Sequence, residues 1–337
     1  MDVQWHIAFS NVTFTEYAGV TYRDYYRSPA NMLSAQQAAK ERAERLFGVG
    51  GFITPYVDIP GIAFSAYLGM PLIEPDEDEL PYIDGRVPLL RAPEDVVRLA
   101  LPDLRTTGWM GWRWDAWQYY RSQGYNVRYG GNSGAILTTA HELSGGDIFL
   151  WALENPEDGK RILDFITEAD LHIRSFDESL CGATNAAYTG DDFSGLMSPD
   201  LYRALAIPQY RKIYAGKTDR FMHSELLRAE HLRIAREELG ITCFHGAACE
   251  NLTLSELHDI MGHRFWTQIT PQDLLELSPH DLTEKVKRFA NSGSGFVQLY
   301  PGRGTPESHM QAALAAVERE CKGGRVGRYL EAEEGVE

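Results

Sequence analysis

Cysteine is scarce in this sequence, which has four in 337 residues and no Cys-x-x-Cys pair. A disulfide framework is therefore not expected, and a chain of this length does not need one. Cys181, Cys243, Cys249 and Cys321 suit a reducing compartment, where most would be small buried residues. Cys249 is kept apart as a candidate for chemistry, because it follows a strand-like segment that contains a histidine.

Long apolar runs are also missing, and basic residues are outnumbered. No stretch approaches the roughly 18 to 20 uninterrupted apolar residues that a membrane-spanning helix needs. The beginning, "MDVQWHIAFSNVTF", has no basic region leading into a hydrophobic segment, so we expect a soluble, unexported, cytoplasmic protein. With 48 acidic against 32 basic residues the net charge is −16, which repels nucleic acid and anionic membranes alike.

Several well-known catalytic and phosphate-binding motifs are absent. The sequence has no HExxH, no GxSxG, and no glycine-rich loop with the spacing that cradles phosphates between a strand and a helix. The glycine-rich stretches "GGNSG" and "PGRG" are typical of turns. No motif of this kind therefore identifies the chemistry.

What the sequence does contain is a regular alternation of short apolar runs and longer amphipathic segments. This order predicts parallel strands joined by crossover helices. The strand candidates are 50–58, 124–134, 184–192, 219–225, 241–248, 264–270 and 295–304. Helix starts such as Asn155-Pro156 and Ser198-Pro199, and the terminating Gly240, support the segments between them.

The number of units points to one architecture. With an eighth strand somewhere in 61–120, eight βα units predict a (β/α)8 TIM barrel, ahead of an open doubly wound sheet. We expect the barrel to occupy residues 50–325. Residues 1–49 would form a helical extension packed on it, and 326–337 a solvated acidic tail.

Two aromatic stretches have a structural and a functional interpretation. In "WMGWRWDAWQYY" (109–120), Trp114 and Trp117 are three apart, as neighbours on one helix face are; the stretch is interpreted as peripheral packing or as a lid over an apolar substrate. The segment "YRDYYRSP" (22–29) could support a homodimer contact through its aromatic and arginine side chains.

A TIM barrel places its active site at the carboxyl ends of its strands. We therefore take the polar residues at the end of each strand candidate as site candidates. These residues are Asp58, Asn132, Tyr188, Asp191, Asp192, His223, Glu225, His245, Cys249, Glu250, Gln268, Tyr300 and Arg303.

His223 and Glu225 are the most specific pair among them. Strand alternation would put both side chains on one face, where an imidazole and a carboxylate suit a divalent metal such as zinc. The alternative is a neutral histidine hydrogen-bonded to a carboxylate, without metal. His245 on the next strand is a candidate third ligand, and Cys249 or Glu250 a candidate fourth.

Several segments together resemble the uroporphyrinogen decarboxylase superfamily, which includes corrinoid-dependent methyltransferases. They follow the family's order from about residue 50 to 320, and the resemblance implies a TIM barrel. The segments are "YVDIPGIAFSAYLGMPL", "GAILTTAHELSGG", "NPEDGKRILDFITEADL", "GDDFSGLMSPDLYRALAIPQYRKI", "FMHSEL" and "GFVQLYPGRGTPESHMQAAL".

The resemblance is closer to the methyltransferase branch than to the decarboxylase. The decarboxylase's "RQAGRY"-like run is not found, and only Asp58 matches its pyrrole-facing aspartate. The methyltransferase branch has a zinc-binding His-x-Cys where this sequence has His223 and Glu225, and a further cysteine where it has Arg303. Losing both cysteines argues against a thiol substrate and favours a harder site suited to oxygen.

The resemblance then implies a zinc-dependent methyltransferase. It would move a methyl group between a methoxylated aromatic or methylated amine and a corrinoid (cobalamin) supplied by a partner protein, as in O-demethylation during anaerobic one-carbon metabolism. The chain has no DxHxxG segment typical of corrinoid binding. The alternatives are a uroporphyrinogen-type decarboxylase and a non-catalytic barrel that binds a tetrapyrrole or corrinoid.

Residue roles follow from the same resemblance. Zinc would act as a Lewis acid on the heteroatom that carries the methyl group. Asp191 or Asp192 would orient ligands or protonate the leaving oxygen, and Arg303 would hold a substrate carboxylate. Tyr188 joins the two aspartates as a catalytic candidate, and the substrate-binding candidates are Asp58, Asn132, Gln268, Tyr300 and Arg303.

Overall fold

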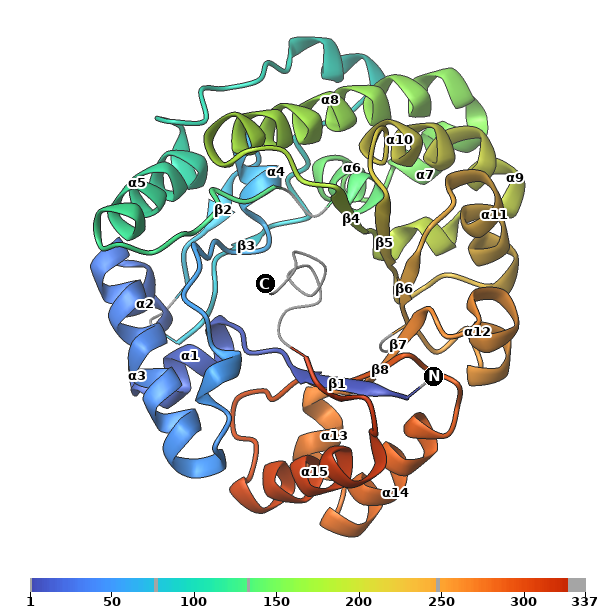
Figure 1. Ribbon diagram of the computed structural model, residues 1–337. Coiled ribbons are helices and arrows are strands. Elements are labelled where there is room, and N and C mark those ends of the chain that lie inside the picture. Colours follow the sequence, from blue (N-terminus) through green and yellow to red (C-terminus); the bar gives the residue numbers. More distant parts are fainter. Residues whose placement is uncertain (1, 76–77, 132–133, 247–248, 327–337) are drawn as a thin grey trace.

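The computed structural model describes residues 2–75, 78–131, 134–246 and 249–326. Its main sheet runs in the order β4-β5-β6-β7-β8-β1-β9, and its pairings are parallel. Helices surround the ring of strands on the outside, as in a TIM barrel (Figure 1). The strands are β1 Gln4–Ile7, β4 Ala186–Gly190, β5 Asp219–His223, β6 Cys243–His245, β7 Phe265–Ile269, β8 Phe296–Leu299 and β9 Gly324–Arg325, with a separate antiparallel pair, β2 Leu72–Ile73 and β3 Tyr82–Ile83.

The helices follow the predicted alternation over most of the chain. Asn155 caps α8 through its side chain, and Gly240 ends α11 in the left-handed conformation, φ 62°. The helices are α1 Asn11–Ala18, α2 Tyr22–Tyr26, α3 Pro29–Phe47, α4 Ala63–Tyr67, α5 Gly108–Ser122, α6 Ile136–Ser144, α7 Ile148–Glu154, α8 Pro156–Cys181, α9 Pro199–Leu201, α10 Ile207–Ile213, α11 Ala229–Leu239, α12 Leu254–Met261, α13 Pro271–Glu276, α14 Pro279–Ala290 and α15 Glu307–Glu320. Shorter helical turns are η1 Gly50–Phe52, η2 Pro93–Arg98, η3 Asp192–Leu196 and the π-helical η4 Tyr202–Ala206.

The barrel begins earlier than the sequence analysis placed it. Residues 4–7 form β1, which pairs along its whole length with β8, so the chain enters the sheet before the helices α1 to α3. An eighth barrel strand was expected in 61–120, and among the described residues of this range, 61–75 and 78–120, the strands are β2 and β3, which pair only with each other. A four-residue strand carries too little pattern to stand out from the sequence around it.

Two predicted strands, 50–58 and 124–134, have no strand assigned among their described residues. Side chains take over the hydrogen bonds that a neighbouring strand would make. Gln36 on α3 bonds both backbone groups of Tyr56, at 2.9 and 3.1 Å. Asp177 on α8 accepts from the Gly130 N–H at 2.8 Å. These segments therefore run in the barrel wall without a β ladder.

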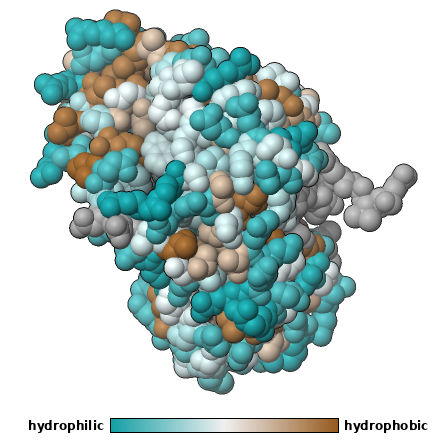
Figure 2. Space-filling model, turned by 90° about the vertical axis from the view of Figure 1, so that its left-hand side faces the viewer, coloured by the Kyte–Doolittle hydropathy of each residue, from teal (hydrophilic) through white to brown (hydrophobic). Residues whose placement is uncertain are grey.

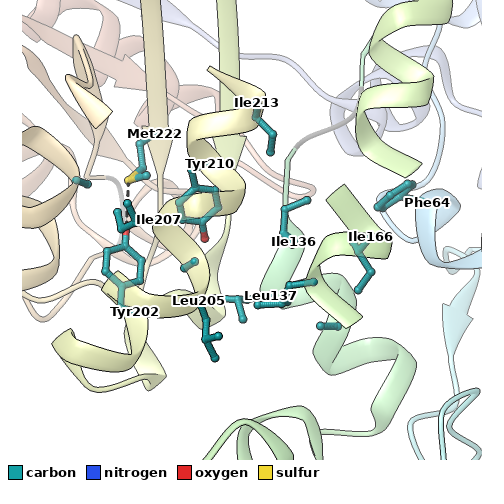
Figure 3. Packing of buried hydrophobic residues seen from close by; sticks show 14 of the residues in the cluster. Phe64, Ile136, Leu137, Ile166, Tyr202, Leu205, Ile207, Tyr210, Ile213 and Met222 are labelled. Carbon is teal, nitrogen blue, oxygen red and sulfur yellow. Dashed lines mark hydrogen bonds between the residues drawn. The ribbon is translucent and has the colours of Figure 1, made fainter. Parts of the chain in front are cut away.

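The largest part of the core lies between the strands and the outer helices. Figure 3 shows Tyr210 of α10, Leu137 of α6 and Ile166 of α8 converging with residues of neighbouring elements, all fully or almost fully buried. Tyr202 reaches Met222 of β5, with its hydroxyl 4.0 Å from the sulfur. Burial of such side chains stabilises each by roughly 1.5 to 3 kcal/mol.

The two aromatic stretches both pack within the protein. Trp114 and Trp117 stack on α5 with ring centroids 5.2 Å apart, and Trp114 also meets Phe176 of α8, which supports the packing interpretation. The tyrosines of 22–29 are 9% exposed or less, so their aromatic rings are not available to a second subunit as that prediction assumed.

On the side of the molecule shown in Figure 2, hydrophobic residues are scattered among hydrophilic and neutral ones. No helix within the described part of the chain is both long and apolar enough to cross a bilayer.

Candidate active site at the carboxyl ends of the strands

The barrel interior is lined by residues two positions apart on each strand, because parallel pairing keeps them at matching depth. The deeper layer is aromatic. Trp266 lies 5.4 Å from Phe296 and 6.4 Å from Phe221, measured between ring centroids. This cluster fills the interior below the site, and its members are Tyr188, Phe221, Cys243, Trp266 and Phe296.

The layer above it is polar and hydrogen-bonded. His245 Nε2 lies 3.1 Å from Gln298 Oε1 and 3.2 Å from Gln268 Oε1. Gln298 Nε2 in turn lies 2.8 Å from His6 Nε2. Four strands, β6, β7, β8 and β1, thus contribute to one connected network.

The donor and acceptor roles in this network follow from the amide groups. An amide oxygen only accepts, so His245 Nε2 carries a proton and donates to both glutamines. An amide nitrogen only donates, so His6 Nε2 accepts from Gln298. Burial lowers the pKa of His245 to about 3 and that of His6 to about 4, so both rings are neutral at pH 7.

His223 stands at the carboxyl end of β5, next to His245, with ring centroids 4.8 Å apart. Its Nδ1 donates to the backbone oxygen of His245 at 3.1 Å, which leaves Nε2 facing outward. Nε2 lies 3.4 Å from Asp192 Oδ1, at the start of η3. An imidazole nitrogen and a carboxylate oxygen at this distance are placed to share a proton or a cation. His223 and Asp192 are therefore the candidate reactive pair of the site.

Glu225 comes near this pair by a different route from the predicted one. β5 ends at His223, so the alternation of a strand does not extend to Glu225, which lies in the following loop. Its backbone N–H donates to Asp192 Oδ1 at 3.0 Å, which holds the loop against η3. Partial burial and the charge of Asp192 raise the pKa of Glu225, and His223 partly offsets the rise.

The site meets part of the requirement for zinc. A ligating histidine usually donates its other ring N–H to a carbonyl or carboxylate, as His223 does. Zinc bonds of about 2.0 to 2.2 Å place two ligands roughly 3.3 to 3.6 Å apart on a tetrahedral edge, and His223 and Asp192 are 3.4 Å apart. Among the described residues, however, no three His, Cys, Asp or Glu side chains gather closely enough to hold a metal. The described residues could therefore provide two zinc ligands, His223 and Asp192, and not a complete shell.

The other proposed metal ligands have different partners. The Nε2 of His245 makes two hydrogen-bond contacts, and both are with the side-chain oxygens of glutamines, Gln268 and Gln298. The Cys249 thiol donates to the Leu227 backbone oxygen at 3.3 Å, and burial raises its pKa to about 11, so it stays a thiol. Cys249 and the exposed Glu250 line a cleft of about 650 Å³ between the segment that follows β6, which includes α12, and the helices α13 and α14.

Asp191 and Tyr188 lie at the carboxyl end of β4, beside the candidate site. Asp191 is 2% exposed and accepts from the backbone N–H groups of Leu137 and Thr138 at 2.7 and 2.9 Å, and from the Tyr210 hydroxyl at 2.7 Å. It therefore anchors the first turn of α6 to the end of β4 and acts as a positioning residue. The Tyr188 ring folds over Gly190, and burial raises its pKa.

The predicted substrate-binding residues are spread around the rim. Asp58 is buried and accepts from the hydroxyls of Tyr25 and Tyr26 at 3.3 and 3.2 Å, and burial raises its pKa to about 6. Arg303 is exposed and lies over the Tyr22 ring, 5.0 Å from its centroid.

Gln268 belongs to the polar layer, as expected for a site residue. Tyr300 donates its backbone N–H to Ile269, at the ends of β8 and β7. Asn132 lies outside the described residues. The substrate-binding roles of these residues remain predictions.

Two site residues were missed from the sequence, His6 and Gln298. A signal was present, since Trp266-Thr-Gln268 and Phe296-Val-Gln298 repeat the same aromatic-x-glutamine pattern on neighbouring strands. His6 lies in β1, and because β1 was not predicted, the sequence analysis gave no basis for placing His6 inside the barrel.

Comparisons with known proteins agree with this architecture. Among solved structures, a methyltransferase from Methanosarcina mazei superposes with a TM-score of 0.72 over 94% of both chains, at 17% sequence identity. No curated protein matches the sequence. The sequence model of the uroporphyrinogen decarboxylase (URO-D) family matches residues 10–319. The chain therefore belongs to the uroporphyrinogen decarboxylase family.

Proposed function

We propose that this protein moves a methyl group between a small-molecule donor, a methoxylated aromatic or a methylated amine, and a corrinoid carried by a separate protein. The observation that carries the proposal is the His223–Asp192 pair, 3.4 Å apart at the carboxyl ends of two neighbouring strands. The family and the fold shared with a solved methyltransferase support it.

The pair suits the departure of an oxygen leaving group. In transfer from a methoxylated aromatic, the methyl carbon would form a bond to the corrinoid of the partner protein, the bond from that carbon to oxygen would break, and the electron pair of the broken bond would stay on the oxygen. A proton held between His223 Nε2 and Asp192 Oδ1 passes to that oxygen, so that a phenol departs rather than a phenolate. Glu225 is held beside the pair by its backbone N–H, which donates to Asp192 Oδ1 at 3.0 Å, and its pKa is raised by burial and by the charge of Asp192.

Zinc is the alternative to this shared proton, because the space between His223 Nε2 and Asp192 Oδ1 cannot hold both; these two residues would then be its ligands. When bound, it would supply a Lewis acid for the oxygen that carries the methyl group. Elemental analysis of protein purified without added metal tests this separately: stoichiometric zinc lost in both His223→Ala and Asp192→Asn supports the ligand assignment, and zinc retained by both variants contradicts it.

Methyl transfer itself is testable without the natural partner. The full chain is incubated with chemically reduced cobalamin and methoxybenzoates or methylated amines labelled with ¹³C in the methyl group. We expect ¹³C-methylcobalamin, detected by NMR, with at least one donor. Labelled methyl groups that stay on every donor, with protein shown to be folded, contradict the proposal for these donor classes.

A decarboxylase is the second candidate, and Asp58 is the observation in its favour. This buried carboxyl, with its pKa near 6 beside two tyrosine hydroxyls, can exchange a proton near neutral pH. The net charge of −16 opposes a polycarboxylate substrate. Release of carbon dioxide from a porphyrinogen would favour this candidate. A non-catalytic barrel predicts neither product, while still binding a corrinoid or tetrapyrrole.

A further inference from the structure

The hydroxyl of Tyr188 is a third polar group close to the His223–Asp192 pair. In the ladder between β4 and β5, Tyr188 pairs with Phe221, and Gly190 pairs with His223. Alternate residues of a strand lie on one face of the sheet. Because Tyr188 packs with Phe221 in the aromatic layer, Tyr188 and Gly190 both face the interior of the barrel.

Gly190 provides the space into which the Tyr188 ring turns. A Cβ atom at position 190 would lie 2.8 Å from Cε1 and 2.9 Å from the hydroxyl oxygen of Tyr188, closer than a side-chain carbon can approach. The ring therefore lies along β4 toward its carboxyl end. Since neighbouring strands are about 4.8 Å apart, the hydroxyl reaches the level of the His223 side chain on β5.

This hydroxyl is available to a bound molecule. Within the described part of the chain it makes no hydrogen bond, and Tyr188 is half-buried. Partial burial raises the pKa of Tyr188, and the charges of Asp192 and Glu225 add to the rise. The hydroxyl therefore keeps its proton at neutral pH and is a donor that lacks an acceptor.

We infer that the Tyr188 hydroxyl donates a hydrogen bond to the oxygen that leaves in methyl transfer, and that Gly190 is the positioning residue that sets the hydroxyl beside His223. The catalytic role rests on the proposed function, whereas the binding of an oxygen at this point does not. When the carbon–oxygen bond breaks, one lone pair of the oxygen takes the proton shared by His223 and Asp192. A second lone pair accepts from Tyr188, which keeps its own proton.

The hydroxyl also distinguishes between the two donor classes of the proposed function. A methoxyl oxygen has lone pairs before its bond to the methyl carbon breaks, so it accepts from Tyr188 as soon as the donor binds. A quaternary ammonium nitrogen has no lone pair, as in the charged ammonium of lysine, and offers no acceptor. The site therefore favours a methoxylated aromatic over a quaternary methylamine.

Binding of a phenol tests the hydrogen bond without turnover. The two probes are para-fluorophenol and para-fluorotoluene, which differ in a hydroxyl against a methyl group of similar size. Titration of the full chain followed by ¹⁹F NMR, with no corrinoid or metal, gives both dissociation constants. We expect the phenol to bind at least about tenfold more tightly, since its oxygen accepts from Tyr188.

Tyr188→Phe keeps the ring and removes only the hydroxyl. It should weaken binding of the phenol about tenfold and leave the toluene unchanged. Gly190→Ala should weaken the phenol to a similar degree, because the added methyl group displaces the Tyr188 ring. The matched controls are Tyr82→Phe, at an exposed tyrosine, and Gly85→Ala, where a methyl group meets no atom within 4 Å; both should bind the phenol as the unmodified protein does.

The double variant separates positioning of the hydroxyl from simple blocking of the site. If Gly190 acts through the hydroxyl, Gly190→Ala has nothing further to displace once Tyr188→Phe is present, so the double variant should bind the phenol as Tyr188→Phe does. A further loss in the double variant, as large as that of Gly190→Ala alone, would show that the methyl group only fills the site.

Equal affinity of the unmodified protein for the two probes, or binding of neither, overturns the inference, as does phenol binding that Tyr188→Phe leaves unchanged. Methyl transfer is measured separately. Its absence, with the phenol result intact, contradicts the proposed function and leaves the hydrogen-bond donor in place. Transfer from a methoxylated donor at the same rate in Tyr188→Phe as in the unmodified protein contradicts the catalytic role alone.

Discussion

At the scale of single residues, Asp58 shows how burial alone gives a carboxyl group a pH dependence near neutrality. Its pKa is about 6 in the folded protein, while an unfolded aspartate titrates near 4. Between these values the folded state holds the proton that the unfolded state has lost. The stability that the protonated carboxyl contributes is therefore present below pH 4 and is lost as the pH rises through 6.

The consequence is measurable against Asp58→Asn, which cannot ionise. Two pKa units correspond to about 3 kcal/mol, so the free energy of unfolding of the unmodified protein should fall by about that much relative to the variant between pH 4 and pH 7. Urea unfolding at a series of pH values gives both curves. Parallel curves would mean that the carboxyl is not desolvated as the structure has it.

The polar layer of the barrel could be predicted only in part, and the reason is again found in single residues. His223, His245 and Gln268 stand at strand ends in the sequence, which was enough to select them. Their partners depend on register: Gln298 is placed opposite both Gln268 and His6 by pairing with β7 and β1. Pairing between strands far apart in the chain cannot be derived from local pattern.

At the scale of elements, the barrel wall is completed by side chains where strands are missing. Gln36 on α3 is fully buried and holds the 53–58 segment, and it also bonds the hydroxyls of Tyr25 and Tyr120 at 2.9 and 3.2 Å. The apolar pattern of that segment correctly suggested a buried element. Its secondary structure could not be predicted, because a distant glutamine provides the hydrogen bonds.

Gln36→Met tests this arrangement, since methionine has a similar volume but no amide. Removing one partner from several buried polar groups should lower the free energy of unfolding by about 3 kcal/mol or more. Gln37→Met is the matched control, because the neighbouring side chain is exposed and should change stability by less than about 0.5 kcal/mol. Equal losses in urea unfolding of the two variants would show that Gln36 does not hold the segment.

At the scale of the whole molecule, the alternation of apolar and amphipathic segments was sufficient to predict a TIM barrel, because eight crossover units have few other solutions. The expectation that the candidate site lies at the carboxyl ends of the strands followed from that fold. The side chains that meet at the candidate site could not all be predicted from the sequence, because the loops after β4 and β5 bring Asp192, His223 and Glu225 together in three dimensions. Sequence spacing suggested a His/Glu pair, whereas the structure has a His/Asp pair with Glu225 beside it.

The central claim is that His223 is the reacting group of a methyl-transferring site. The most direct measurement is the single-turnover rate of methyl transfer from the best donor to reduced cobalamin, compared between the unmodified protein, His223→Ala and the surface control His263→Ala. We expect His223→Ala to lower the rate by about 100-fold or more, and His263→Ala to leave it unchanged. A rate that His223→Ala does not alter would contradict the account.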